Sequence, residues 1–190
     1  MPASPIRKLT PYAEAAKARG VKVYHLNIGQ PDLPTPEKAM EAIRSIDKRT
    51  LSYSMSQGTP ALREEFSKYY RTFGIDLDPD EIIVTAGGSE ALLATFLTCF
   101  DPGDEVIITE PGYANYLSFA EAAGLVVKAV TSKIENGFAL PSAEDFKKAI
   151  TPRTKAILIC NPNNPTGYLY SPEELFQLRD LVKEHDLFLI

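Results

Sequence analysis

The chain has 190 residues, 44% of them hydrophobic and 24% charged, which is an ordinary globular composition with enough length for one good core. Its net charge of −5 argues against a nucleic-acid or anionic-membrane partner. No apolar run approaches the length of a membrane span, and the N-terminal stretch lacks the apolar centre of a signal peptide, so we expect a soluble, cytoplasmic protein.

The first part of the chain predicts short elements separated by loops. Local patterns favour a helix over residues 12–19, a strand over 22–27, and helices over 36–47 and 61–74. The proline-rich segment 28–36 is expected to form a fixed loop. We expect a boundary near residue 48, between an N-terminal arm with part of a small domain (residues 1–47) and a main sheet domain (residues 48–190).

From residue 81 onward, short apolar runs alternate with helical patterns. Strands are predicted over 82–85, 105–109, 125–130 and 155–160 and from 187, with helices over 89–100, 113–123, 142–150 and 171–185. This order predicts an α/β fold, in which a mostly parallel sheet carries helices on both faces. Because the sequence stops at Ile190 within a predicted core strand, we expect the sheet domain to be truncated.

Two connections from strand to helix suit a ligand. The segment Ala86-Gly-Gly-Ser-Glu-Ala91 combines small residues with a helix N-terminus, whose free N–H groups and dipole favour a phosphate. The segment Glu110-Pro-Gly-Tyr-Ala-Asn-Tyr116 presents aromatic rings. Tyr113 can stack on a flat ring, whereas Tyr116 can pack under the following helix.

The segment Asn161-Pro-Asn-Asn-Pro-Thr-Gly167 is the most distinctive connection in the sequence. Two prolines and a glycine stiffen the turn, and three asparagines place amides at the carboxyl end of a predicted strand, where open α/β sheets bind ligands. The chain has neither a G-x-G-x-x-G nor a Walker A pattern, which disfavours a Rossmann-like nucleotide-binding domain.

These three connections resemble motifs of the class I/II, fold-type I aminotransferases, which use pyridoxal 5′-phosphate (PLP), and the match is to aspartate aminotransferase-like members. All seven residues of 161–167 agree with the N-P-N-N-P-T-G signature, and 51–64 and 27–32 resemble two further family segments. The resemblance covers about residues 5–190 but only the first half of the family's pattern. It implies the large PLP-binding domain, incomplete here, and a transferase of amino-acid metabolism.

The resemblance also assigns cofactor-binding residues. Gly88, Ser89 and Glu90 match the loop that holds the PLP phosphate. Tyr113 matches the aromatic residue that covers the pyridine ring, and Asn164 matches the residue that hydrogen-bonds the phenolic oxygen of the cofactor.

Four other residues receive different roles. Tyr53 matches a tyrosine that reaches the cofactor of the neighbouring subunit, which implies a homodimer, and Gly29 matches a backbone position near the substrate carboxylate. Asn161 and Asn163 are expected to cap the turn rather than to bind a ligand.

No catalytic residue is assigned within the chain. Transamination needs a lysine that holds PLP as a Schiff base, and the family motif that carries it has no match here. Lys133 lies in a polar stretch that predicts an exposed loop, so it is not a candidate. The 190 residues alone are therefore expected to be inactive. No metal site is expected either, because Cys99 and Cys160 lack metal-ligand spacing and are interpreted as small buried hydrophobes.

The main hypothesis is the N-terminal portion of a PLP-dependent aminotransferase that moves an amino group between an amino acid and a 2-oxo acid. Two alternatives keep the cofactor. One is a PLP-dependent lyase or an aminocyclopropane-carboxylate-synthase-like enzyme, and the other is a non-catalytic PLP-binding sensor domain. The sensor usually follows a basic DNA-binding module, whereas this sequence begins directly with the arm.

Overall fold

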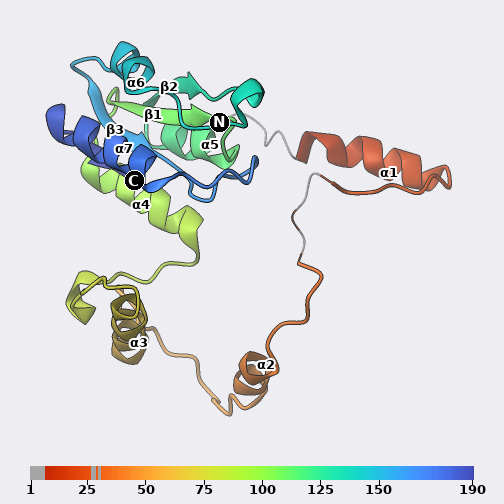
Figure 1. The fold of residues 1–190 in the computed structure, drawn as a ribbon. Helices are drawn as coiled ribbons and strands as arrows, with labels where there is room; N and C mark the ends of the chain where they lie inside the picture. The colour runs from red at the N-terminus through yellow and green to blue at the C-terminus, as the bar shows by residue number, and fades with distance from the viewer. Residues whose placement is uncertain (1–6, 27–28, 30) are drawn as a thin grey trace. The chain divides into compact units, whose positions relative to one another are not determined.

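A computed structural model describes residues 7–26, 29 and 31–190 (Figure 1). Two compact units make up these residues. One is Pro11–Gly88, and the other is Ser89–Ile190 together with the described residues before Pro11. The boundary expected near residue 48 and the domains on either side of it stay predictions.

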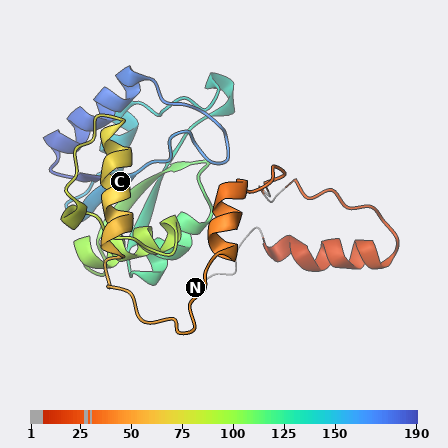
Figure 2. The same cartoon turned by 90° about the horizontal axis from the view of Figure 1, so that it is seen from below.

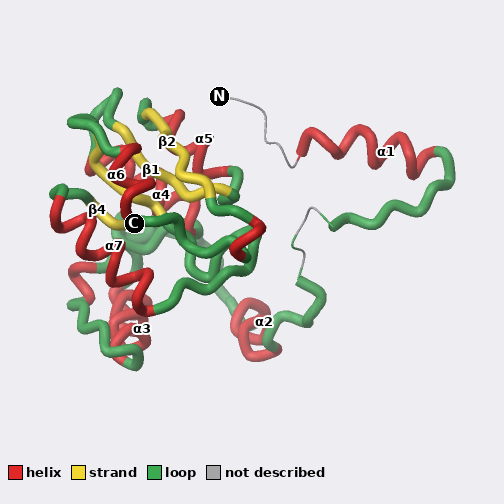
Figure 3. The backbone as a smooth tube through the Cα atoms, turned by 45° about the horizontal axis from the view of Figure 1, so that its top comes forward, coloured by secondary structure: helices red, strands yellow, loops and turns green. Residues whose placement is uncertain are grey.

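A parallel sheet of four strands, in the order β2-β1-β3-β4, forms the centre of the Ser89–Ile190 unit (Figure 3). The strands are β1 (Glu105–Glu110), β2 (Val126–Thr131), β3 (Thr154–Leu158) and β4 (Phe188–Leu189). Every residue of β1 except the last is buried, as near-continuous apolar strands covered on both faces require. The predicted α/β fold and these four strands are confirmed.

Helices cover both faces of this sheet (Figure 3). On one face, α4 (Gly88–Cys99) and α5 (Asn115–Ala122) enclose a core that includes Phe96, Val106 and Ile108. On the other face, α6 (Ala143–Ala149) and α7 (Pro172–Glu184) pack on a second core with Ile107 at its centre. The four predicted helices of this unit are confirmed. Among the described residues, no helix combines the length and apolar character that a membrane span requires.

The start of α7 is fixed by a reciprocal pair of hydrogen bonds. Ser171 Oγ accepts from the Glu174 N–H at 3.2 Å, and Glu174 Oε2 accepts from the Ser171 N–H at 2.7 Å. Pro172 occupies the first helical position, where its missing N–H costs nothing.

We expect Ser171→Ala to lower the free energy of unfolding by about 1 kcal/mol, because it removes one arm of this capping box. Urea unfolding of the variant and the wild type measures the difference. Ser118→Ala, in the interior of α5 rather than at a cap, is the control. An equal loss in both variants would contradict the role of Ser171.

The Pro11–Gly88 unit contains α1 (Thr10–Ala18) except for its first residue, α2 (Glu37–Arg44) and α3 (Pro60–Arg71), the last drawn yellow-gold in Figure 2. Arg63 of α3 is buried and holds the turn η2 (Pro79–Glu81). Its Nη1 donates to the Pro79 carbonyl at 2.8 Å and to Asp80 Oδ1 at 2.9 Å. A guanidinium that bonds a backbone carbonyl and a carboxylate in this way supports a structural role for Arg63.

Two predicted strands are wrong. Residues 22–26 and 82–85 are not part of any sheet, and residue 27 lies outside the described residues. The Val84 N–H donates to the Gln57 carbonyl at 3.0 Å, and Ile83 is 71% exposed. Extended apolar backbone becomes a strand only beside a partner that continues the ladder, and neither segment has one among the described residues.

Candidate functional site

The turn after β3 is held by two of its three asparagines. Asn163 is buried, and its Oδ1 accepts from the Thr166 N–H at 3.2 Å and from the Thr166 hydroxyl at 2.9 Å. Asn161 Oδ1 accepts from the Tyr170 N–H at 3.0 Å. The capping role predicted for Asn161 and Asn163 is confirmed, since each uses its side-chain oxygen to satisfy backbone of the same turn.

Asn164 differs from Asn161 and Asn163. Its side chain is exposed, and within the described part of the chain its amide makes no hydrogen bond. A stiff turn therefore presents one uncommitted amide, able both to donate and to accept, beyond the carboxyl end of β3.

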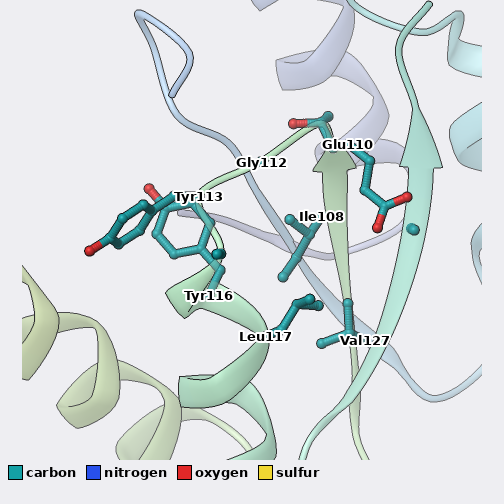
Figure 4. Close-up of a pocket in the computed structure, with 10 residues that line it drawn as sticks. Ile108, Glu110, Gly112, Tyr113, Tyr116, Leu117 and Val127 are labelled. Atoms are coloured by element: carbon teal, nitrogen blue, oxygen red, sulfur yellow. The ribbon is translucent and has the colours of Figure 1, made fainter. Parts of the chain in front are cut away.

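Tyr113 follows β1, the strand beside β3 in the sheet. The tyrosine is half-buried, and its hydroxyl accepts from Asn115 Nδ2 at 2.8 Å. Tyr113 is one of the residues that line a mainly apolar hollow of about 300 Å³, counted with its open mouth (Figure 4). The hollow is also lined by the end of β1, the first turn of α5 and the side chains of Val127 and Ala129 from β2. An aromatic residue just beyond the carboxyl end of a strand, beside a mainly apolar hollow, suits stacking on a flat ring.

The turn that presents Tyr113 requires a glycine before it. A Cβ at Gly112 would lie 2.6 Å from the Thr109 carbonyl oxygen, closer than real Cβ atoms approach backbone. The connection between β1 and α5 therefore packs closely against the end of β1 at this glycine.

We expect Gly112→Ala to move this turn and to lower the free energy of unfolding by about 1–3 kcal/mol, as overpacking does. Thermal unfolding checks the loss. Gly137→Ala is a control for the loss of a turn glycine at an open position, since a Cβ there meets nothing within 4 Å although its φ is +67°. A smaller loss for Gly112→Ala than for Gly137→Ala would contradict the steric argument.

The first turn of α4 supplies the third feature of this edge. Its leading N–H groups have no carbonyl partner within the helix, and Gly88, Ser89 and Glu90 are all exposed. The Ser89 hydroxyl makes no hydrogen bond among the described residues. Because α4 ends shortly before β1 begins, its N-terminus points toward the carboxyl edge of the strands. Exposed N–H groups and a hydroxyl at a helix N-terminus can bind an anion.

The structure thus places Ser89, Glu90, Tyr113 and Asn164 at one edge of the sheet unit. Gly29 and Tyr53 belong to the other unit, where both are exposed, Tyr53 over its whole surface. Lys133 is exposed before the turn η3 (Ile134–Asn136), as its polar surroundings predict.

The interpretation of the cysteines as buried hydrophobes is wrong. Cys99 is exposed on α4, and Cys160 is half-buried directly after β3. Burial, together with the neighbouring Cys160 and Tyr113, raises the pKa of Tyr116 to about 12.

Comparison with known proteins agrees with these motifs. The family model for class I and II aminotransferases matches residues 21–190. The aspartate/prephenate aminotransferase of Thermus thermophilus is 42% identical over 176 residues, which are 92% of this chain and 46% of that protein. The fold is similar to a solved single mutant of Thermus thermophilus aspartate aminotransferase, with a TM-score of 0.92 and 40% identity over 100% of this chain and 50% of the other.

An alanine aminotransferase from Pyrococcus furiosus is similar as well, with a TM-score of 0.91 and 34% identity over 98% of this chain and 49% of the other. The chain spans about half the length of the curated relatives it matches.

Proposed function

Because the chain belongs to the class I and II aminotransferase family, we propose that the whole protein transfers an amino group between an amino acid and a 2-oxo acid with the aid of PLP. When bound, PLP supplies an electron sink for the bonds of the substrate's α-carbon. The residues of this chain bind and orient it.

The described residues fit such a cofactor. The open first turn of α4, with the Ser89 hydroxyl, suits the phosphate, and Gly88 and Glu90 contribute to the same loop. The half-buried ring of Tyr113 suits stacking on the pyridine ring. Asn164 suits the phenolic oxygen, where a donated hydrogen bond stabilises negative charge.

One observation carries this assignment: of the three asparagines in the turn, only Asn164 makes no side-chain hydrogen bond within the described part of the chain. A turn that served only to connect β3 with α7 would need the two caps but not a third, exposed amide between two prolines.

Two residues of the other unit complete the proposal. Tyr53 is exposed over its whole surface, so it is available to reach the cofactor of a second subunit in a homodimer. Gly29 would bring backbone close to the substrate carboxylate. The lysine that attaches PLP has no match among these 190 residues, so the chain by itself is expected to bind PLP weakly and not to turn over. A cytoplasmic location is part of the same proposal.

The experiment is a spectroscopic and product assay of the full-length protein. We expect it to bind PLP, and adding aspartate or alanine should convert the bound cofactor to its amino form with release of one 2-oxo acid per site. Both donors are tested because the similar proteins include aspartate and alanine aminotransferases.

Three outcomes would contradict the proposal. Failure to bind PLP would remove the cofactor assignment. Binding without conversion by any amino acid would favour a sensor. Release of ammonia or of a cyclised product, with the cofactor returned unchanged, would favour a lyase or a cyclopropane-forming enzyme.

A further inference from the structure

Tyr168 closes the turn that carries Asn164. The Asn163 N–H donates to the Tyr168 carbonyl at 2.8 Å, and the Tyr168 N–H donates to the Thr166 hydroxyl oxygen at 3.2 Å. The Thr166 hydroxyl donates in turn to Asn163 Oδ1 at 2.9 Å. The two residues that flank the Asn164-Pro165 pair are therefore both tied to the backbone of Tyr168.

The side chain of Tyr168 is fixed separately, by Glu174 in the first turn of α7. The half-buried tyrosine donates its hydroxyl to the carboxylate, at distances of 3.2 Å to Oε1 and 3.3 Å to Oε2. Partial burial and the negative charge of Glu174 raise the pKa of Tyr168, so the hydroxyl remains a donor at neutral pH.

Glu174 is itself anchored by two backbone groups. Its Oε1 accepts from the Leu140 N–H at 2.8 Å, in the connection that precedes α6, and its Oε2 accepts from the Ser171 N–H at 2.7 Å. Hydrogen bonds to an ionised carboxylate are stronger than neutral ones, so this carboxylate is a firm anchor for the Tyr168 hydroxyl.

The anchor matters because the turn has little else to hold it. Among the described residues, the other hydrogen bonds of residues 163–168 stay within that segment. The Tyr168 hydroxyl is thus the group that joins the closed turn to a helix by a hydrogen bond, and without it the turn can move as a unit.

We propose that Tyr168 is a positioning residue for PLP, whose hydroxyl, held by Glu174, fixes the turn 163–168 and so sets the position of the Asn164 amide against the cofactor. The inference rests on the proposed function, because it takes Asn164 as a cofactor ligand. Tyr168 itself is assigned no contact with PLP.

The test compares the full-length protein with Tyr168→Phe, which keeps the ring but removes the hydroxyl. We expect the dissociation constant for PLP to rise about fivefold, the effect of one ordinary hydrogen bond. The pH at which the absorption of bound PLP changes should shift in the same direction as in Asn164→Ala, because both variants weaken the bond to the phenolic oxygen. In the cofactor-free protein, amide hydrogen exchange of residues 163–168 should become faster.

Ser171→Ala is the matched control. It removes a hydroxyl from the same helix start but leaves the bond between Tyr168 and Glu174 in place. It should therefore lower thermal stability while PLP affinity, the pH of the absorption change and the exchange of residues 163–168 stay at wild-type values. If Tyr168→Phe gives this same pattern, its hydroxyl is merely structural and the inference is overturned.

The double variant Asn164→Ala/Tyr168→Phe shows whether the hydroxyl acts through the amide. It should bind PLP no more weakly than Asn164→Ala alone, since the position of an amide that has been removed no longer matters. A further loss of affinity in the double variant would mean that Tyr168 acts by another route, which also overturns the inference.

The two proposals fail in different ways. If the wild-type protein binds no PLP, the proposed function falls, and the positioning role falls with it. If the wild type binds PLP and Asn164→Ala weakens the binding, unchanged affinity and absorption in Tyr168→Phe overturn the positioning role alone.

Discussion

Glu105→Ala is expected to lower the free energy of unfolding by about 2–4 kcal/mol, a loss typical of leaving a cavity and unsatisfied polar groups in a core. The Glu105 side chain is fully buried at the start of β1, with 0% exposure. Its Oε2 accepts from the Thr151 hydroxyl at 2.6 Å and the Thr154 hydroxyl at 3.2 Å, and its Oε1 accepts from Arg153 Nη2 at 3.0 Å. Alanine would leave a cavity and two hydroxyls that lose their acceptor.

Glu105→Gln should cost less, about 1.5–3 kcal/mol, because it keeps the volume and loses mainly the charge of the acceptor. The two cations near the carboxylate, Arg153 and Lys128, are 69% and 39% exposed in their side chains. Water can solvate them once the carboxylate is gone, so neither becomes a buried unpaired charge.

The pH dependence of stability separates the effect of the lost charge from the effect of the lost side-chain volume. The pKa of Glu105 lies below its ordinary value of 4.5, mainly because Thr151 donates a hydrogen bond to the carboxylate. Hydrogen bonds from Arg153 and Thr154 and the charge of Lys128 lower the pKa as well, whereas burial opposes them. A depressed carboxyl pKa stabilises the fold above the unfolded value and loses that contribution as the pH falls through the folded value. The wild type should therefore lose stability below about pH 4.5 more steeply than Glu105→Gln.

Urea unfolding at neutral pH and at successively lower pH measures both quantities. Glu135→Ala is the matched control, since Glu135 is exposed in η3 and makes no ion pair among the described residues. If Glu105→Ala costs no more than Glu135→Ala, the buried network contributes nothing to stability.

Local sequence signals were sufficient to predict the strands and helices of the sheet unit. The apolar runs that became β1 and β3 are short, rich in branched side chains and bounded by turn residues, so their identity as buried strands follows from the residues themselves. The start of α7 was equally explicit, because Ser171-Pro-Glu-Glu contains both members of a capping box and a proline at the first helical position.

Non-local facts were not available from the sequence. Residues 82–85 have the composition of a strand, but pairing depends on a neighbour that spacing does not specify. Glu105 gave no sign that its carboxylate would meet hydroxyls from Thr151 and Thr154, more than 40 residues away. The motifs predicted the edge of the sheet at which the cofactor is proposed to bind.

The second large effect is expected at Asn164. Asn164→Ala in the full-length protein should raise the dissociation constant for PLP about 10- to 100-fold, which corresponds to the loss of one hydrogen bond to a charged oxygen. The exposed amide makes no hydrogen bond within the described part of the chain, so the unfolding free energy of the cofactor-free protein should stay within about 0.5 kcal/mol of wild type.

Asn163→Ala should lower stability, and any loss of PLP affinity should be a consequence of that loss. Removing its buried side-chain oxygen leaves the Thr166 N–H and hydroxyl without their acceptor, so the cofactor-free protein should lose about 1–3 kcal/mol. Any loss of PLP affinity would then follow from a loosened turn, and it should shrink when osmolytes restore the folded state.

Titration of the cofactor-free protein with PLP, beside urea unfolding of the same samples, distinguishes these two roles. The two variants should differ although the residues are adjacent. Asn164→Ala should lower PLP affinity without changing the free energy of unfolding, whereas Asn163→Ala should lower the free energy of unfolding. If both variants lose stability equally, Asn164 is a third cap and its assignment as a cofactor ligand is wrong. If neither variant changes PLP affinity, the assignment of Asn164 as a cofactor ligand is wrong.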